Sequence, residues 1–224
     1  MKEYKISIEL LSDLLIGSGE GFGTLIDTDI IFDNYGIPYI PSKRIKGCIK
    51  DSFKEVIDSY KKFIDTTILE AQKLELEDNI FGNGSKNIKG CVFFDNLYLN
   101  GYEEHKLNQE WLEYFTKNSD PDFKLNYMFG KERITNALTS IRKQTKINDL
   151  GVAEEGSLRS IRVISKNNEV KFIGKIVFNK ENQQILNLIN VCVKNLKNIG
   201  TMRNRGFGYI KCTIEDLESN EVKK

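Results

Sequence analysis

The sequence is poor in the residues that most often build metal centres and acid–base pairs. Its 224 residues include one histidine, His105, and four cysteines that show no paired C-x-x-C spacing. A zinc site needs tighter clustering of ligands, and a ribonuclease mechanism that relies on two histidines is excluded. We therefore expect Cys48, Cys91, Cys192 and Cys212 to be reduced and to pack as small apolar side chains.

Neither sign of charge dominates, and no apolar run is long. The chain has 33 Lys and Arg residues against 32 Asp and Glu residues, so any basic surface must be local. The apolar runs are too short to span a bilayer, and the chain does not open on a basic and then apolar leader. These absences predict a cytoplasmic protein with no membrane partner. The length fits a single domain over residues 1–224 with insertions.

Hydrophobic periodicity predicts an α+β fold. Once two polar stretches are set aside, the order of elements is β-α-β-β-α-β, a ferredoxin-like or RRM-like core with two helices on one face of an antiparallel sheet. Ser42 is expected to be the N-cap of the first helix. Strands are predicted at residues 4–11, 25–32, 89–99, 170–178 and 207–214, and helices at residues 43–61, 68–76 and 181–197.

Two stretches interrupt this core. Residues 101–135 are polar and irregular, which indicates an insertion. Residues 138–165 contain short β-like pieces on either side of the soft segment GVAEEG, which predicts a protruding β-hairpin.

The segment GTMRNRGFG at residues 200–208 is the strongest candidate for anion binding. Glycines let a backbone approach a phosphate closely, and Arg203 and Arg205 carry planar, permanently charged forks that match phosphate oxygens. Phe207 and Tyr209 would either stack on bases or fill the core. A glycine-rich turn that leads into a buried strand is the alternative, but the two arginines favour the nucleic-acid interpretation.

The segment PSKRIKG at residues 41–47 places cations at the start of a helix. Ser42, Lys43, Arg44 and Lys46 lie where unpaired N–H groups and the helix dipole already favour an anion. An ordinary solvated helix start is the alternative, although acidic residues would be its usual choice. The predicted hairpin also carries spaced cations that either follow an RNA backbone or are simply solvated: Arg142, Lys143, Lys146, Arg159 and Arg162.

Three aspartates follow the first glycine-containing loop. In an extended segment, Asp27, Asp29 and Asp33 would share one face. Clustered carboxylates serve as base, acid or metal ligand in phosphodiester cleavage, or they form the solvated face of an edge strand. The residues alone do not separate these two interpretations.

Five segments, in this order, give the chain a resemblance to the RAMP superfamily, and within it to the backbone subunits of type III CRISPR effector complexes. They are LLIGSG at residues 14–19, IPYIPSKRIKG at 37–47, Phe81-Gly82 followed by GCVFFD at 90–95, the hairpin from 145 to 158, and the loop at 200–208. The resemblance covers nearly the whole chain.

The resemblance implies an RRM-like palm and a thumb hairpin that inserts between guide and target RNA, in subunits that stack on copies of themselves and on other effector subunits. It implies that the guide's phosphates are held by Ser42, Lys43, Arg44 and Lys46 and by Arg203 and Arg205, and it places Arg142 and Lys146 on the thumb that follows the RNA. In cleaving members an aspartate, which corresponds to Asp27, cuts target RNA with a divalent metal, expected to be Mg²⁺. Asp29 is the competing candidate.

Two alternatives to a target-cleaving subunit stay open. The first is a guide-RNA-binding subunit without nuclease activity, in which the aspartates are structural. The second is a guide-processing endoribonuclease of the same superfamily. Such enzymes commonly use a histidine in the N-terminal half, whereas His105 lies in the predicted insertion.

Overall fold

The central sheet is built around strand β1 (Lys2–Leu10) in the computed structural model. From position 4 onward the even-numbered residues of β1 are buried, as a period of two predicts. β1 pairs antiparallel with β6 (Lys171–Phe178) on one side and with β7 (Ile210–Asp216) on the other. β2 (Val92–Phe94) and β3 (Tyr98–Leu99) both pair with β6, so the sheet order is β2-β6-β1-β7 with β3 beside β6.

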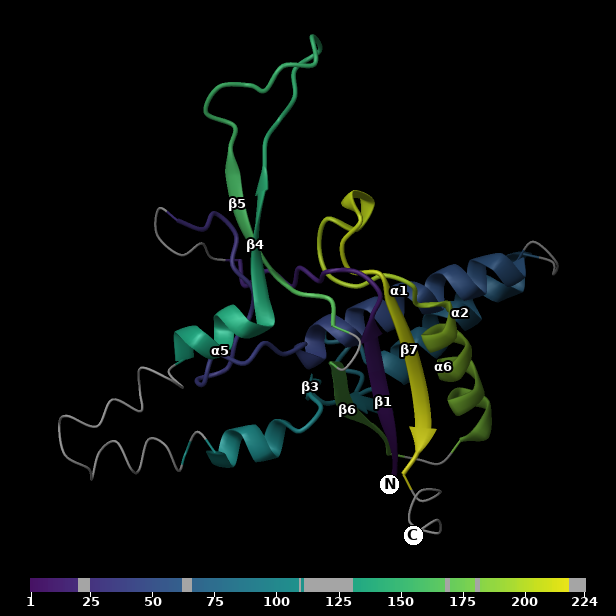
Figure 1. Cartoon of the computed structure of the whole chain (residues 1–224). Coiled ribbons are helices and arrows are strands. Elements are labelled where there is room, and N and C mark those ends of the chain that lie inside the picture. The colour runs from purple at the N-terminus through teal and green to yellow at the C-terminus, as the bar shows by residue number, and fades with distance from the viewer. Residues whose placement is uncertain are drawn as a thin grey trace.

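Helices α1 (Ser42–Lys61) and α6 (Gln183–Asn195) lie on the same side of this sheet (Figure 1). The Ser52 hydroxyl of α1 donates to the carbonyl of Cys192 in α6 at 2.7 Å, so the two helices are joined by a buried hydrogen bond as well as by apolar packing. Helix α2 (Thr66–Phe81) packs on α1 and is longer than the predicted 68–76. The molecule is therefore an α+β protein with antiparallel sheets, as the periodicity predicts.

The structure describes residues 1–19, 25–61, 66–108, 110, 131–167, 170–179 and 182–217. Residues 111–130 of the predicted insertion therefore lie outside the described residues. In the rest of the insertion the prediction of irregular structure is wrong, since residues 102–108 are helical and α5 (Lys131–Leu138) is a helix. Thr135 of α5 is buried and donates to the carbonyl of Gly36 at 3.1 Å, a contact across 99 residues that local pattern does not reveal.

Strands β4 (Thr139–Gln144) and β5 (Arg159–Ile164) pair antiparallel in a separate two-stranded sheet. Figure 1 shows this hairpin extending away from the central sheet, on the same side as the loop between α6 and β7. Its base is attached to the segment after β1, where Leu14 and Ile164 form a β-bridge and Arg142 lies 2.6 Å from a carboxylate oxygen of Asp13.

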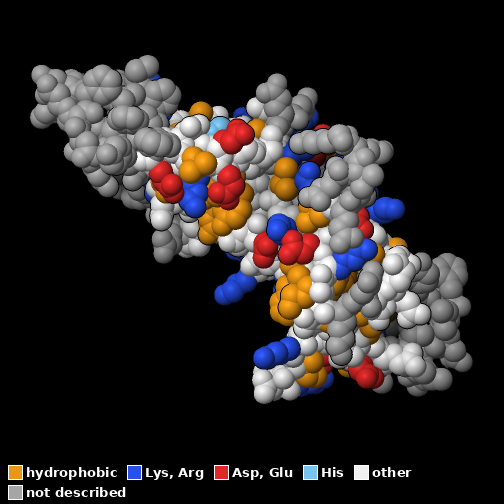
Figure 2. Space-filling view, turned by 90° about the horizontal axis from the view of Figure 1, so that it is seen from below, with side chains coloured by type: hydrophobic (Ala, Val, Ile, Leu, Met, Phe, Trp, Pro, Cys, Tyr) orange, Lys and Arg blue, Asp and Glu red, His pale blue; other side chains and the backbone are white. Residues whose placement is uncertain are grey.

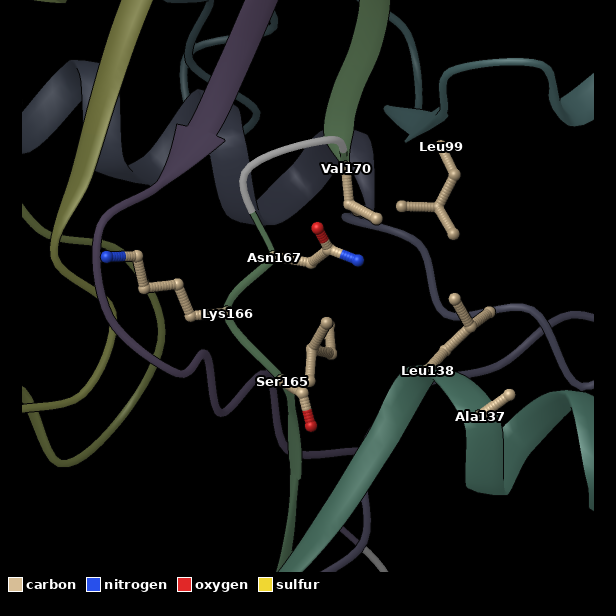
Figure 3. A pocket seen from close by; sticks show the side chains of 8 residues that line it. Leu99, Ala137, Leu138, Ser165, Lys166, Asn167 and Val170 are labelled. Carbon is tan, nitrogen blue, oxygen red and sulfur yellow. The ribbon is translucent and has the colours of Figure 1, made fainter.

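A cavity of about 560 Å³ lies where the hairpin meets the sheet (Figure 3). Aliphatic side chains share its wall with the polar residues Ser165, Lys166 and Asn167. Among the described residues, its lining consists of Leu99, Ala137, Leu138, Ile164, Ser165, Lys166, Asn167 and Val170. Packing at this junction is therefore incomplete on the α5 side, and the contacts to the segment after β1 fix the hairpin.

The end of the molecule opposite the hairpin, seen from below, shows acidic and basic side chains intermixed (Figure 2). The N-terminus and the end of β7 lie at this end in Figure 1, and the ion pair between Lys2 and Asp216, at 3.3 Å, joins the first and last strands there. Positive charge is thus not concentrated on this face, as the near-zero net charge predicts.

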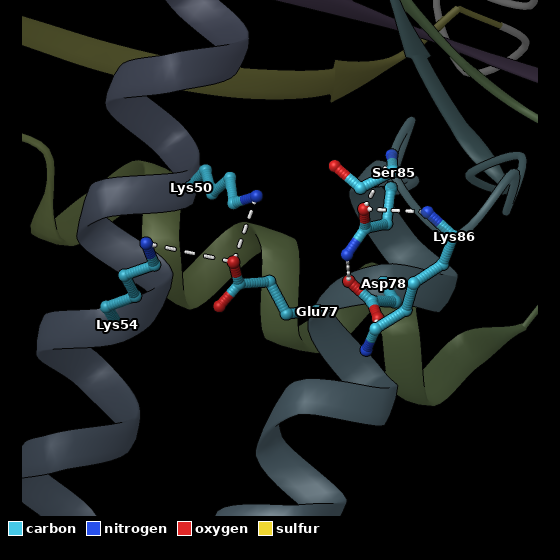
Figure 4. A network of polar contacts seen from close by, with 7 residues as sticks. Lys50, Lys54, Glu77, Asp78, Ser85 and Lys86 are labelled. Atoms are coloured by element: carbon cyan, nitrogen blue, oxygen red, sulfur yellow. Dashed lines mark hydrogen bonds and ion pairs between the residues drawn. The ribbon is translucent and has the colours of Figure 1, made fainter.

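Two buried carboxylates at the end of α2 fix its contacts (Figure 4). Glu77, only 8% exposed, lies 2.9 Å from Lys50 Nζ and 3.7 Å from Lys54 Nζ of α1. Asp78 accepts hydrogen bonds from Asn83 at 2.8 Å and from Lys86 at 2.7 Å. Because a buried carboxylate needs partners, this network determines how α2 and the following turn pack.

Asp78 is expected to make stability depend on pH. The hydrogen bonds from Lys86 and Asn83 lower the pKa of Asp78, so the unfolded chain binds its proton more readily than the folded chain. This stabilisation is complete above the unfolded pKa of about 4 and is lost as pH falls through the folded pKa. Asp78→Asn should lower Tm by a few degrees at neutral pH, with a difference from wild type that shrinks below about pH 4. Thermal unfolding between pH 7 and pH 3 tests this, and a difference that stays constant over that range would contradict it.

Candidate nucleic-acid interface

The glycine-rich loop is folded tightly against the segment that follows β1. Gly200 and Gly208 have φ angles of 82° and 74°, and a side chain at either position would overlap a backbone carbonyl oxygen, that of Leu15 or of Ile199. The Gly208 N–H donates to the carbonyl of Asp13 at 2.8 Å. These contacts occupy the backbone up to Tyr209, so the last strand begins at Ile210 rather than at the predicted 207. The glycines are therefore required by close backbone packing.

Arg203 and Arg205 lie on the outer turn of this loop, in the short 3₁₀ helix η1 (Arg203–Arg205). Both side chains are exposed. Arg203 Nε donates to the carbonyl of Gly200 at 3.1 Å, and Arg205 Nη1 donates to Gln144 of β4 at 3.3 Å. An open groove of about 710 Å³ runs beside the turn, and Arg159 of β5 lines it together with both arginines. The loop and the hairpin thus form one basic groove.

The start of α1 differs from the prediction in one respect. Ser42 is the first helical residue rather than the N-cap, and the Pro41 carbonyl accepts the first helical hydrogen bonds. The Ser42 N–H donates to the side-chain oxygen of Asn96 at 2.8 Å, so a residue from the segment between β2 and β3 satisfies this helix end. The expected role of the Ser42 side chain as a cap is therefore wrong, because Asn96 takes the place of a local partner.

The predicted cations of this helix start are near the surface. Lys43 and Arg44 are exposed and Lys46 is half-buried. Arg44 Nη2 donates to the carbonyl of Gly17 at 3.4 Å. The helix start is thereby connected to the loop after β1.

The helix start and the glycine-rich loop both contact the segment that follows β1. Burial raises the pKa of the Cys48 thiol, and the positive charges of Arg203 and Arg44 both act in the opposite direction. Arg44 donates to the carbonyl of Gly17, and the Thr201 N–H donates to the carbonyl of Leu15 at 2.9 Å, so the two basic segments meet at the loop after β1 although about 160 residues separate them in the chain. They form one two-part basic surface.

Several of the hairpin cations are engaged in ion pairs, so fewer of them are free to contact an RNA backbone than their spacing predicts. Arg142 is paired with Asp13, and Lys146 lies 2.7 Å from a carboxylate oxygen of Glu154. Arg162 is 15% exposed and pairs with Asp29, so the expectation of an exposed cation there is wrong. Lys143 and Arg159 are the exposed cations of this set for which no ion pair is found among the described residues.

The three aspartates have different partners. The segment from residue 25 to 33 makes isolated bridges to Gly17, Ile161 and Pro38 instead of a regular strand. Asp27 is exposed, and its Oδ2 accepts the Ser160 N–H at 2.6 Å. Asp29 is half-buried against Arg162. The acidic strip therefore separates into individual carboxylates with different partners.

Asp33 belongs to a turn. Its Oδ1 accepts the N–H groups of Tyr35 at 2.9 Å and of Ile37 at 2.8 Å, which stabilises the chain reversal before α1. Burial, together with the Asp33 carboxylate, raises the pKa of the Tyr102 hydroxyl. Within the described ranges, no group of three His, Cys, Asp or Glu side chains converges where a metal ion could bind.

Residues 7–211 match the model of one protein family, the RAMP superfamily. The chain belongs to the RAMP superfamily. The resemblance seen in five separate sequence segments is thus confirmed over nearly the full length. A comparison with curated protein sequences found no match.

This RAMP protein shares its fold with a chain of the type III-B Cmr-beta cryo-EM structure in the apo state. The TM-score is 0.62 at 14% identity, over 95% of this chain and 97% of that chain. A chain of type III-B Cmr-beta bound to cognate target RNA matches with the same TM-score and identity, over 96% of this chain and 97% of that chain. At this identity the likeness shows the fold.

Sequence reasoning missed three residues of the RAMP protein's interface. Asn96 holds the helix start, Gln144 contacts Arg205, and Ser160 holds the Asp27 carboxylate. Each acts on a partner more than 50 residues away. The polar pair Asp95-Asn96, which interrupts the predicted strand at 89–99, is the signal that could have identified the first of them. No helix in the described part of the chain is long and apolar enough to cross a membrane.

Proposed function

We propose that this RAMP protein is a guide-RNA-binding backbone subunit of a cytoplasmic type III CRISPR effector complex, and that it cleaves complementary target RNA. The observation that carries the proposal is the two-part basic surface formed by the start of α1 and the glycine-rich loop. An RNA backbone can lie across it, since exposed cations and a helix N-terminus meet at the loop after β1. Membership of the superfamily and the fold shared with Cmr-beta chains, one of them bound to cognate target RNA, support the same conclusion.

The core corresponds to a ferredoxin-like palm in this proposal. The observed sheet order β2-β6-β1-β7, with α1 and α2 between β1 and β2 and α6 between β6 and β7, supports a β-α-β-β-α-β arrangement in which α2 is an addition. The hairpin β4–β5 corresponds to the thumb. Its tip exposes Ile147, Leu150 and Val152 by 63%, 86% and 60%, which suits insertion between bases rather than contact with phosphates.

Asp27 is the proposed catalytic residue. The 2′-hydroxyl oxygen of a target nucleotide attacks the adjacent phosphorus, and the bond from phosphorus to the 5′-oxygen of the next nucleotide breaks. This leaves a 2′,3′-cyclic phosphate, and the departing 5′-oxygen takes a proton from water. The Asp27 carboxylate takes the proton of the 2′-hydroxyl as a general base. Displacement of a nucleotide by the thumb allows the in-line geometry that this attack needs. Because Ser160 holds Oδ2, the carboxylate is oriented before RNA binds.

The residues present would hold a divalent cation only together with a phosphate of the bound RNA. Asp27 is a single exposed carboxylate, and the described residues form no cluster of three acidic or metal-binding side chains around it. Mg²⁺ is often held by one or two carboxylates together with substrate phosphates and water. Asp27 and an RNA phosphate would hold it here, and the ion would stabilise the charge that develops on the phosphate.

A non-catalytic guide-binding subunit is the second candidate. One observation favours it: the short hydrogen bond from Ser160 to Asp27 is also what a structural carboxylate would make. In that case the basic surface keeps its role and the chain cuts nothing.

Cleavage of target RNA by the assembled complex decides between these functions. The complex should be assembled on a guide RNA and given labelled complementary RNA with Mg²⁺, with a non-complementary RNA as control. We expect cuts at regular intervals in the complementary RNA only. Binding without cuts would favour the non-catalytic subunit, and cleavage of a precursor guide by the isolated chain would indicate a processing enzyme. Failure to bind guide RNA at all would contradict both main candidates.

A further inference from the structure

The Asp27 segment is attached directly to strand β5 of the hairpin. The Asp27 N–H donates to the Ser160 carbonyl at 2.8 Å, and the Ser160 N–H donates back to Asp27 Oδ2 at 2.6 Å. One step further along, the Arg162 N–H donates to the carbonyl of Thr28 at 3.0 Å, and Thr28 forms a parallel bridge with Ile161. The carboxylate is therefore positioned by the hairpin rather than by the central sheet.

A half-buried ion pair lies beside these hydrogen bonds. Arg162 Nη1 is 3.6 Å from Asp29 Oδ2, with exposed fractions of 15% and 13% for the two side chains. The guanidinium of Arg162 also lies 5.6 Å from the ring centroid of Phe32. Its Nε is buried with no hydrogen-bond partner among the described residues, so Asp29 is the main charge compensation for this arginine.

Because this ion pair is half-buried, it fixes how the segment around Asp29 aligns with β5. A charge removed from water must stay close to its partner, so a shift of the segment by one residue would leave Asp29 and Arg162 both uncompensated. The backbone of Asp29 is fixed as well, because its carbonyl accepts the N–H of Ser18 at 2.9 Å and the Ser18 hydroxyl at 3.1 Å. Asp29 follows Asp27 by two positions, and Arg162 follows Ser160 by two positions. The ion pair and the carboxylate contact are therefore neighbouring contacts of one attachment.

We propose that Arg162 is a positioning residue that fixes the Asp27 carboxylate relative to the hairpin, so that the two move as one unit. A nucleotide displaced by the hairpin is then delivered at a constant distance from Asp27. The proposed effect on cleavage rests on the function proposed for Asp27, whereas the attachment itself does not.

Hydrogen exchange in the isolated full chain tests the attachment without any cleavage. In Arg162→Met we expect the amides of Asp27 and Ser160 to exchange at least about tenfold faster than in wild type, because the unpaired Asp29 releases the segment. Arg142→Met is the matched control. Arg142 lies on β4, the other strand of the same hairpin, and the substitution breaks its ion pair with Asp13. It should leave these two amides unchanged. Equal exchange in Arg162→Met and wild type would overturn the proposal.

Cleavage kinetics in the assembled complex test the consequence. We expect Arg162→Met to lower kcat for target cleavage roughly 100-fold with KM unchanged, since a displacement of about 1 Å is enough for such a loss. Arg162→Lys, which keeps the charge but not the planar fork, should recover part of the rate, and it replaces Arg162→Met if that variant does not fold. Lys175→Met removes a surface ion pair with Glu3 on the central sheet and should cleave as wild type does.

The outcomes separate the two proposals. Faster exchange in Arg162→Met with a wild-type complex that never cuts RNA would support the attachment and contradict the catalytic function. Normal kcat in Arg162→Met despite faster exchange would overturn its role in positioning Asp27 for cleavage.

Discussion

Replacement of Asp27 by alanine is expected to lower the rate of target cleavage by at least about 100-fold, with guide and target binding retained. General-base catalysis contributes roughly 10²–10⁴ to a rate, and Asp27 is the exposed carboxylate of the three in this segment. Its removal takes away one hydrogen bond to Ser160, whereas the backbone bond from Asp27 to Ser160 remains. Cleavage of labelled complementary RNA by the assembled complex, under single-turnover conditions, measures the loss.

Asp27→Asn separates the loss of the basic group from a loss of local structure. Its amide oxygen can still accept the Ser160 N–H, so the local structure is preserved while the basic group is lost. We expect the same loss of cleavage as with alanine. Cleavage by Asp27→Asn at the wild-type rate would remove Asp27 from catalysis. Asp29→Asn serves for comparison, because Asp29 compensates the charge of Arg162. Loss of the Asp29 charge should lower the cleavage rate only by changing the position of Asp27.

The parts of the fold that depend on local pattern were predictable from the sequence. The alternation in β1 and the apolar face of α1 identify elements whose buried sides are set by neighbours in the chain. A glycine-rich turn before the last strand was predictable too, but the close backbone packing that Gly200 and Gly208 allow was not. Its two arginines are exposed, as anion binding requires.

The parts that depend on distant partners were not predictable. Arg162 has the spacing of a surface cation on a hairpin, but Asp29, 133 residues earlier, draws it into a half-buried pair. Ser42 has the identity of an N-cap, but Asn96 satisfies the helix end from another element. In both cases, the tertiary partner determines the role of the side chain, and one sequence does not reveal that partner. The same limit applies to Asp27, Asp29 and Asp33, whose closeness in the sequence hides three different environments.

Removal of the four cations at the two-part basic surface is expected to weaken guide-RNA binding on the order of 100-fold. The variant carries Lys43→Ala, Arg44→Ala, Arg203→Ala and Arg205→Ala. Each exposed contact to a phosphate contributes about 0.7 kcal/mol, and about 1.4 kcal/mol corresponds to a factor of ten in Kd. Each phosphate contact on a single strand also adds about 0.7 to the slope of log K against log salt, so the slope should flatten by about 2.8. Titration of the isolated chain with a labelled guide at several salt concentrations measures both quantities.

A second variant with the same change in net charge separates local contacts from overall charge. Lys5, Lys171, Lys175 and Lys211 lie at outward positions of the central sheet, where β1, β6 and β7 pair. Their replacement by alanine also removes four positive charges but leaves the basic surface intact. We expect the salt slope of this control to stay near the wild-type value, because counterions are released only where phosphates are contacted. Equal flattening in the two variants would show that RNA is held by diffuse charge, and the glycine-rich loop with the start of α1 would then not be its binding site.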